Sequence, residues 1–424
     1  MTERRRFKHI SIPPHLIDDI VRGDCVLFIG AGASTEGKGT SYWPDLLVDE
    51  LVEECGYPPT LPKALPDVAQ YYCRNLDANR KGRLVRLIRD RISRYMSNPE
   101  AYFTVTICHS IIATIPYFRI IVTTNWDPFM ERIANIIPIV RDTDMAYWSD
   151  SSRQVLKMHG CVADPSTMVI TSSDYEEYLK TRIQSAICNK LRDLMSTKTF
   201  LFIGYGLADT SFETIHNDIL TRMAEFARAS FAVVPEATDK DMELWKTRGV
   251  TMIDALAFPF LEELRNKLID AGAMFEVNRE IKTVSKEREK MADTHVETSA
   301  QQERNVGLLS SMYQDGLQHG LDTLEYGLRL GVTREQLEAD LRNQRMTLAS
   351  YRESDNEFRD TEIAYCAGRV RCIEWFLSEN RTSLLPYFSA KLMEPASREE
   401  FQRELDEEII SNSTDDQGKD SKGT

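Results

Sequence analysis

The chain has 424 residues, of which 42% are hydrophobic and 28% are charged, close to the averages of globular proteins. That length is sufficient for a large buried core and predicts two domains. No apolar run reaches 18 residues, and the basic N-terminus lacks the apolar segment of a secretory signal, so the sequence predicts a cytoplasmic protein without a membrane-spanning helix.

The formal charge of −14 is unevenly distributed along the chain. Residues 276–424 contain 30 acidic and 20 basic side chains, and an acidic surface repels phosphate backbones. We therefore expect no direct nucleic-acid binding by this part of the chain. A basic cluster at the N-terminus is either a solvated arm or a contact for nucleic acid or an acidic partner; it consists of Arg4, Arg5, Arg6 and Lys8.

An apolar run turns into a glycine loop at residues 26–34, VLFIGAGAS. Gly30 and Gly32 lack a Cβ, so the chain can bend sharply here and bring N–H groups close to a phosphate. Ala31 and Ser34 belong to the same loop. The third glycine of the full dinucleotide fingerprint is absent. Because glycine turns after core strands are common, this loop alone leaves open whether it binds a nucleotide.

Eight apolar runs have strand character and alternate with helical stretches. This pattern predicts a doubly wound, Rossmann-like α/β domain with a parallel sheet over residues 1–275. The predicted strands cover residues 25–30, 119–123, 137–140, 155–158, 168–171, 199–203, 230–234 and 250–253. Residues 43–118, between the first two strands, form a helical insertion that either covers the site as a lid or thickens one layer of the sheet.

Polar or glycine-rich loops follow three of the later strands. Residues 123–127 read TTNWD, residues 157–160 read KMHG, and residues 204–209 read GYGLAD. The carboxyl ends of parallel strands line one crevice. We therefore expect these three loops and the first glycine loop to meet at a single ligand.

Beyond residue 275 the pattern becomes wholly helical. Residues 276–300 are charged and poor in apolar side chains, which predicts a linker or an exposed helix. Residues 301–410 predict an all-α domain, with helical runs at 334–351 and 355–379 and one apolar stripe formed by Leu317, Leu321, Leu324 and Leu328. Glycines in this region suit close contact of helices within the domain or between subunits; they are Gly316, Gly320, Gly327 and Gly331. Residues 411–424 have the composition of a disordered tail.

The four loops, in this order, resemble those of the sirtuin-like superfamily, whose members bind NAD and break its bond to nicotinamide. The likeness is greatest to the sirtuin-like branch of bacterial anti-phage defence systems. It covers roughly residues 15–275, and its specificity lies in the combination of the motifs. The resemblance implies an NAD glycohydrolase that releases nicotinamide and ADP-ribose.

Two residues are the candidates for catalysis. The resemblance implies that Asn125 holds the ribose and an attacking water, although an Asn here also suits a helix cap near Pro128. His159 is the candidate for proton transfer, because imidazole titrates near neutral pH. A histidine at a strand end is otherwise often structural, and the motif around His159 favours the catalytic interpretation.

The other candidates bind the rest of the NAD molecule. By resemblance Asp127 contacts the nicotinamide amide, with a helix cap as the alternative. Ser34 and the first glycine loop are expected to hold the pyrophosphate, and the second glycine turn is expected to pass under the adenosine ribose. Asp209 binds a hydroxyl or caps the next helix. The full set of cofactor-binding candidates is Gly30, Ala31, Gly32, Ser34, Thr124, Asp127, Gly204, Tyr205, Gly206 and Asp209.

The eight cysteines include no Cys-X-X-Cys pair, so we expect no zinc, unlike in the protein-deacylating sirtuins. Residues 161–175 also lack the element with which those enzymes clamp an acyl-lysine peptide, which favours water as the acceptor. A non-catalytic module that senses NAD or ADP-ribose remains the alternative, and a protein deacylase is less favoured.

Regulation follows from the expected activity, because unrestrained NAD hydrolysis would harm the host cell. We expect restraint by a homo-oligomer or by a partner. The resemblance suggests a HerA-type hexameric ATPase as that partner, with the helical domain assembling the subunits.

Overall fold

The computed structural model describes residues 10–34, 43–150, 152–181, 184–205, 228–299, 306–329, 331–353 and 358–378, together with Arg381 and Leu384. The chain divides into two compact units, Met1–Leu268 and Ile269–Thr424. Each unit has its own buried core, as expected for a chain of this length.

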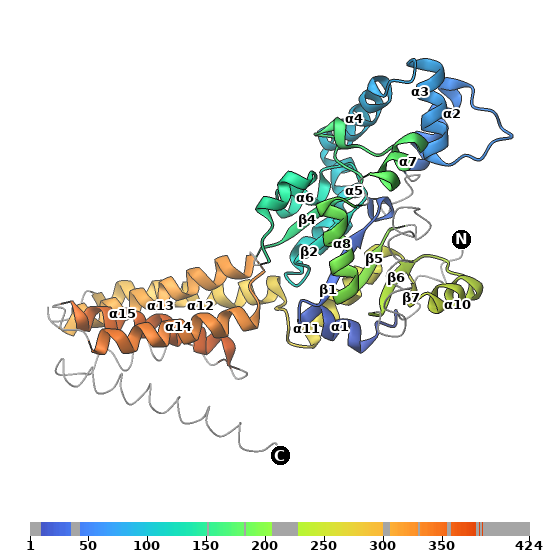
Figure 1. Cartoon of the computed structure of the whole chain (residues 1–424). Coiled ribbons are helices and arrows are strands. Elements are labelled where there is room, and N and C mark those ends of the chain that lie inside the picture. Colours follow the sequence, from blue (N-terminus) through green and yellow to red (C-terminus); the bar gives the residue numbers. More distant parts are fainter. Residues whose placement is uncertain are drawn as a thin grey trace. The chain divides into compact units, whose positions relative to one another are not determined.

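The first unit is built on a seven-stranded parallel sheet with the strand order β3-β4-β2-β1-β5-β6-β7 (Figure 1). The central strands are apolar and buried on both faces, as parallel sheets covered by helices require. The strands are β1 (Cys25–Ile29), β2 (Ile120–Thr123), β3 (Pro138–Ile139), β4 (Gln154–Lys157), β5 (Thr199–Ile203), β6 (Ser230–Val234) and β7 (Val250–Asp254). The predicted doubly wound α/β domain is confirmed.

Strand β1 lies at the topological switch point of the sheet. The chain leaves β1 for β2 on one side and later returns to β5 on the other side. Ile29 is paired with Thr123 of β2 and with Ile203 of β5, so the three strands end level with one another. A switch point at the carboxyl ends of parallel strands is where α/β folds bind ligands.

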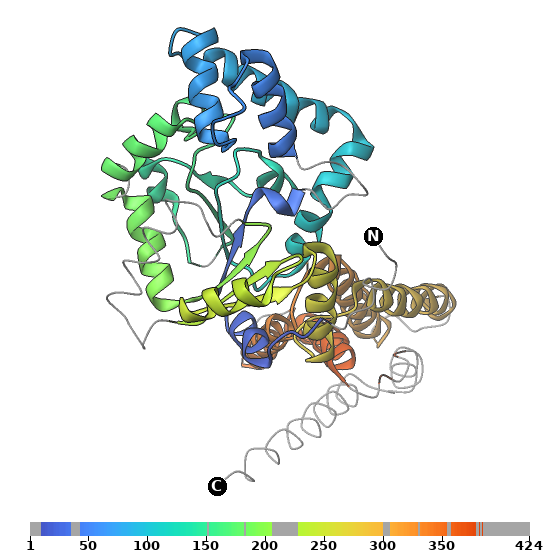
Figure 2. The same cartoon turned by 90° about the vertical axis from the view of Figure 1, so that its right-hand side faces the viewer.

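Helices cover both faces of this sheet (Figure 2). Helix α8 (Ala186–Thr197) packs its apolar side on Val26, Phe28 and Phe202, whereas α5 (Pro99–Thr114) lies on the opposite face. Outside the helical insertion, the other α-helices in the described residues of the unit are α1 (Pro14–Val21), α6 (Phe129–Ala134), α7 (Ser172–Lys180), α10 (Asp239–Thr247) and α11 (Ala257–Asp270).

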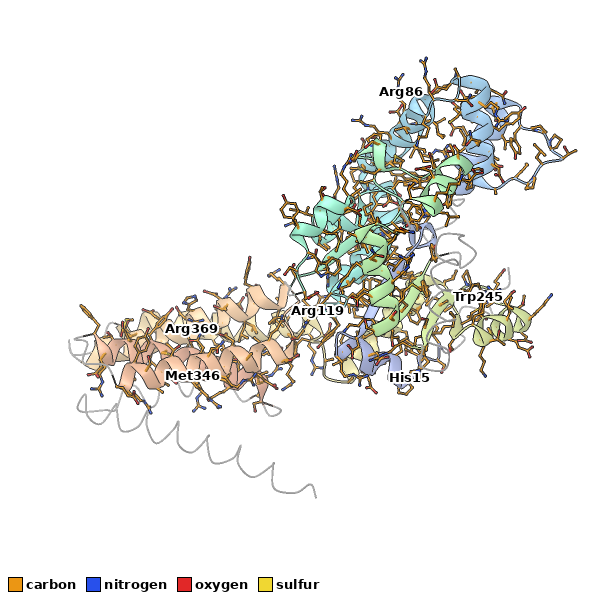
Figure 3. All side chains as sticks on the ribbon, in the orientation of Figure 1. His15, Arg86, Arg119, Trp245, Met346 and Arg369 are labelled. Carbon is orange, nitrogen blue, oxygen red and sulfur yellow. The ribbon has the colours of Figure 1, made fainter. Side chains whose placement is uncertain are left out.

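The helical insertion forms a module with its own core. It consists of α2 (Trp43–Cys55), α3 (Leu65–Leu76) and α4 (Gly82–Ser97), and Arg86 projects from α4 at the surface of the module (Figure 3). Trp126 from the loop after β2, Phe129 from the start of α6, and Met168 and Ile170 from the chain after β4 belong to the same apolar cluster. The module therefore packs on the segments that follow β2 and β4, and Val105 of α5 belongs to the same cluster. A role of the module as a lid stays a prediction.

The strand predicted at residues 168–171 is wrong. Met168, Val169 and Ile170 are buried, but they form no strand, because other groups satisfy their backbone. The Val169 N–H donates to the His159 carbonyl over 3.1 Å, and the Ile170 N–H donates to the Asp174 carboxylate over 3.0 Å. Apolar character here reflects burial under the helical module.

The start of α7 is bonded to that module. Thr171 and Asp174 form a capping box, and Asp174 also pairs with Lys81 at 2.8 Å. Ser172 donates to Asp67 and Ser173 donates to Gln70, both on α3. Helix α7 therefore connects the module to the chain that follows His159.

The second unit is a helical bundle of α12 (Val277–Ser299), α13 (Val306–Arg329), α14 (Arg334–Arg352) and α15 (Arg359–Leu377) (Figure 1). The predicted stripe of leucines on α13 is buried inside the bundle. A Cβ at Gly316 would lie 2.1 Å from the Tyr365 carbonyl oxygen of α15, and a Cβ at Gly320 would lie 2.7 Å from the Cys372 Cβ. These two glycines permit close helix contact within the domain.

Residues 276–300, expected to form a linker or an exposed helix, contain helix α12, and one face of this helix is buried. Val284 and Met291 of α12 are fully buried in the bundle core, and Glu287 accepts the Leu384 N–H over 2.6 Å. Charge on the exposed side of α12 concealed its buried face. The boundary between the units falls at residue 268 rather than 275, and the expected tail at 411–424 lies outside the described residues.

In the part of the chain that the structure describes, no helix is both long and apolar enough to cross a membrane. All eight cysteines carry free thiols. Within the same residues, His, Cys, Asp and Glu side chains form no group of three or more suited to a metal ion.

Candidate active site

Two glycine loops meet at the switch point. The Gly30 N–H donates to the Ile203 carbonyl over 2.9 Å, and the Gly32 N–H donates to the Gly204 carbonyl over 2.7 Å. Gly204 has a φ of +62°, and a Cβ there would lie 2.0 Å from the Ala33 nitrogen. Only glycine suits this approach of backbone to backbone. The N–H groups of Gly30 and Gly32 thus bond within the protein, and their contact with a pyrophosphate stays a prediction.

Ser34 ends the first loop, in the short 3-10 turn Ala31–Ser34. Its side chain is only 3% exposed, and among the described residues its Oγ has no hydrogen-bond partner. A buried hydroxyl without a partner costs free energy. Its position after β1 is therefore suited to a ligand oxygen, as predicted for the pyrophosphate.

The loop after β2 is fixed to the end of β1. Thr123 Oγ1 donates to the Ile29 carbonyl over 2.8 Å and accepts the Asn125 N–H over 3.0 Å. Asn125 is only 7% exposed, whereas Thr124 is half-buried. These bonds place the amide of Asn125 in the loop next to the first glycine loop.

Asp127 has two carboxylate oxygens in different situations. Its Oδ1 accepts the Phe129 N–H over 3.2 Å at the start of α6, so the side chain does cap this helix. Its Oδ2 is buried and has no partner in the described part of the chain. Burial raises the pKa of Asp127, and the charge of Lys157 partly opposes this shift. One oxygen is therefore left for a ligand such as an amide.

His159 lies in a buried aromatic pocket after β4. Its ring packs edge-on against Tyr175 and Tyr178, with ring centroids 5.2 and 5.6 Å away. Its Nδ1 lies 3.4 Å from the Tyr175 hydroxyl. The next loop bonds to the Asn125 loop, since the Val162 N–H donates to the Trp126 carbonyl over 2.9 Å. Asn125 and His159 thus belong to two directly bonded loops.

Tyr205 lies within the second glycine turn and is nearly buried. Its ring lies 4.4 Å from that of Phe28 and stacks on Phe202, so its ring contributes to the core beside the loop. Gly206 and Asp209 lie outside the described residues. The structure therefore brings together the loops after β1, β2, β4 and β5.

One polar pair beneath these loops was missed by the sequence reasoning. Lys157, the last residue of β4, is fully buried and pairs with Glu131 of α6 at 2.7 Å. The available signal was a lysine that follows the apolar pair Val155 and Leu156 and stands directly before Met158 and His159.

Two glycine loops thus meet at the switch point, with an Asn loop and a His-Gly loop beside them, and this part of the chain is similar to a known family. Residues 119–253 match the family described as the SIR2-like domain. The match covers β2 to β7, and so includes three of the four loops.

The chain is also similar to individual proteins that carry a name. The chain is 31% identical over 221 residues to the NAD(+) hydrolase ThsA of Enterococcus faecium, which covers 51% of this chain and 44% of that protein. It is 29% identical over 232 residues to NAD(+) hydrolase ThsA of Bacillus cereus strain MSX-D12, covering 53% and 46%. Defense-associated sirtuin 2 of Bacillus subtilis is 26% identical over 248 residues, 55% of this chain and 23% of that protein. The aligned part is thus less than half of each relative.

Proposed function

We propose that this chain is an NAD glycohydrolase that acts as a regulated effector of anti-phage defence. The observation that carries the proposal is the meeting of four motif-bearing loops at the switch point of a SIR2-like sheet. Relatives of the matched region are named NAD(+) hydrolases and a defence-associated sirtuin, which supports both the reaction and its setting.

The reaction needs few groups. Water attacks C1′ of the nicotinamide ribose, the bond from C1′ to nicotinamide breaks, and nicotinamide leaves as a neutral molecule. The transition state resembles an oxocarbenium ion, so the site has to hold NAD and water in line. In the proposal Asn125 holds the ribose and the water, and His159 accepts the proton that the water loses. The products are nicotinamide, ADP-ribose and a proton.

The other site residues hold NAD in this proposal. Ser34 contacts the pyrophosphate with its buried hydroxyl, and Asp127 binds the nicotinamide amide with the oxygen that does not cap α6. The turn at Gly204 and Tyr205 passes under the adenosine ribose. Thr124, Gly206 and Asp209 complete the set, together with Gly30, Ala31 and Gly32 in the first loop.

Assembly and location form part of the same proposal. The chain acts in the cytoplasm as a homo-oligomer restrained by its own assembly or by a HerA-type ATPase, without zinc and without direct contact to nucleic acid. Metal analysis of the purified protein and mass measurement by light scattering, with and without the ATPase, check these points.

The test is release of nicotinamide and ADP-ribose from NAD, followed by chromatography. We expect Asn125→Ala and His159→Ala each to abolish turnover while the fold survives, which melting temperatures measured alongside the rates will show. Asn98→Ala is the matched control: Asn98 caps α5 by accepting the N–H groups of Glu100 and Ala101, so its loss costs about 1 kcal/mol of stability and leaves turnover intact.

The outcomes separate the alternatives. NAD binding without turnover in every assembly state would make the chain a sensor. Nicotinamide release only with an acyl-lysine peptide would make it a deacylase. Near-normal activity of either variant would show that its residue is a cap or a core side chain.

A further inference from the structure

A buried ion pair lies directly beneath the loop that carries Asn125. Lys157 Nζ donates to Glu131 Oε1 over 2.7 Å and to the main-chain carbonyl of Asp127 over 2.5 Å. The lysine side chain is 0% exposed and that of Glu131 is 8% exposed. One ammonium group therefore joins three segments: the end of β4, helix α6 and the loop after β2.

Stability does not explain why a lysine is buried here. Burial alone lowers the pKa of Lys157, but the attraction of neighbouring acidic groups, Glu131 first and Asp127 among the others, together with the hydrogen bond to Glu131, outweighs it. The pKa is therefore raised, which keeps the group charged. Desolvation of both charges is costly, and apolar residues of similar volume often pack in place of a buried ion pair without loss of stability. The pair therefore calls for another role.

The geometry of the loop identifies that role. At its start, Thr123 Oγ1 bonds to the Ile29 carbonyl and to the Asn125 N–H. At its end, the Lys157 ammonium holds the Asp127 carbonyl. Both ends of the segment that carries Thr124 and Asn125 are thus attached to neighbouring strands, and each attachment is a hydrogen bond from a side chain to a main-chain carbonyl.

We propose that Lys157 is a positioning residue, which fixes the segment 123–127 through the Asp127 main-chain carbonyl so that Asn125 is held for NAD cleavage. Glu131 keeps the ammonium charged and in place. This inference rests on the proposed function for its catalytic part, while the attachment of the segment is a property of the fold that can be measured separately.

The test replaces the pair as a unit, because Lys157→Met alone would leave Glu131 buried without its partner. In the double variant Lys157→Met/Glu131→Leu both charges are gone, and we expect a melting temperature close to that of the wild type. The kcat for NAD is expected to fall by about 10- to 100-fold with KM changed by less than about threefold, because the loss affects orientation more than binding.

Lys198→Met provides a matched control. Lys198 Nζ also bonds a carboxylate, that of Asp24 at 2.6 Å, and a main-chain carbonyl, that of Gly23 at 3.4 Å. It lies before β5, at the opposite end of the sheet from the candidate site. Its loss is expected to leave kcat within about twofold.

Hydrogen–deuterium exchange of the peptide that covers residues 123–129 gives a readout independent of turnover. We expect faster exchange in the double variant and unchanged exchange in Lys198→Met. Should the double variant fail to fold, Lys157→Arg keeps the charge but places planar nitrogens in the site, and faster exchange is expected there as well. Unchanged exchange in the folded variant, or a loss of kcat that merely follows a loss of melting temperature, would overturn the positioning role. If the wild type does not hydrolyse NAD but exchange still rises, the proposed function fails and the attachment of the segment stands.

Discussion

His109 shows how strongly burial acts on single residues of the first unit. It lies on α5, nearly inaccessible, with its ring edge-on to Phe129 at 6.0 Å. Burial lowers the pKa of His109 to about 4, although the charge of Glu131 acts in the opposite direction. The ring is therefore neutral in the folded protein at pH values where an unfolded chain would already bind a proton.

The lowered pKa of His109 predicts that the folded protein becomes less stable in acid. Between about pH 6.5 and pH 4 the unfolded state binds more protons than the folded state, so the free energy of unfolding falls as the pH falls, by up to about 3 kcal/mol. His109→Gln should lose this component in denaturant unfolding measured across the range. Because the raised pKa of Asp127 gives the opposite trend, the comparison is made between variants.

The control for this prediction is His15→Gln, in which an exposed histidine of α1 is replaced (Figure 3). It should leave the pH profile of the wild type unchanged. A profile for His109→Gln that is as steep as that of the wild type would contradict the prediction.

Gly204 allows a second prediction at this scale. Gly204→Ala introduces a Cβ against the Ala33 backbone and should lower the free energy of unfolding by about 3 kcal/mol or more. Gly23 also has a positive φ, of +72°, but nothing lies within 4 Å of its Cβ position, so Gly23→Ala should cost only about 1–2 kcal/mol. If Gly204→Ala and Gly23→Ala lowered the free energy of unfolding equally, in thermal or denaturant unfolding, the two glycine loops could move apart at little cost.

Single site residues were predictable to different degrees. The glycine loops and the positions of Asn125 and His159 at strand ends followed from apolar runs and their flanking residues, as the structure confirms for the described loops. The bond between Lys157 and Glu131 was not predictable, because β4 and α6 come together only in the folded sheet. A buried lysine reads like a surface lysine in a linear sequence.

At the scale of elements, the strands were predictable wherever apolar residues pair in the sheet. The strand prediction for residues 168–171 was wrong because apolar composition indicates burial and does not indicate which groups the main chain bonds to. The N–H groups of this segment bond to the His159 carbonyl and to Asp174. For residues 276–300 a linker or an exposed helix was expected, and the burial of α12 was missed because its buried residues, such as Val284 and Met291, are widely spaced among charged ones.

The contact of α13 with α15 gives an element-scale prediction. Gly316→Ala places a Cβ 2.1 Å from the Tyr365 carbonyl oxygen, so the helices must separate and the second unit should lose about 1–3 kcal/mol. Gly327→Ala, on the same helix, meets only Val332 at 3.4 Å and should be neutral or stabilising by up to about 1 kcal/mol. Circular dichroism of thermal unfolding compares the two variants, and a neutral Gly316→Ala would contradict the packing.

At the scale of the whole molecule, the two units set where the chain can be divided. A cut near residue 290 would break α12 between Val284 and Met291, both of which are buried in the second unit. A cut after Gly272 falls between α11 and α12. We expect residues 1–272 to fold cooperatively, because α11 contributes its buried leucines to the first unit.

This fragment tests the proposed assembly role of the helical unit. If that unit assembles subunits, residues 1–272 should form particles with fewer subunits than the full chain, as measured by light scattering. The fragment should still release nicotinamide from NAD. A fragment with the same number of subunits as the full chain would show that assembly resides in the first unit. Buried glycine contacts inside the bundle already account for Gly316 and Gly320, so the outer surface has to supply any contact between subunits.

The cap of α7 has a mechanical consequence. Asp174 closes the first turn of that helix and holds Lys81 of the helical module, while Tyr175, the next residue, lies against His159. If the module moves away from the sheet, either these bonds break or α7 travels with it. If α7 travels with the module, the Tyr175 hydroxyl moves away from the His159 imidazole. Opening of the module would then change the surroundings of His159 in the same motion.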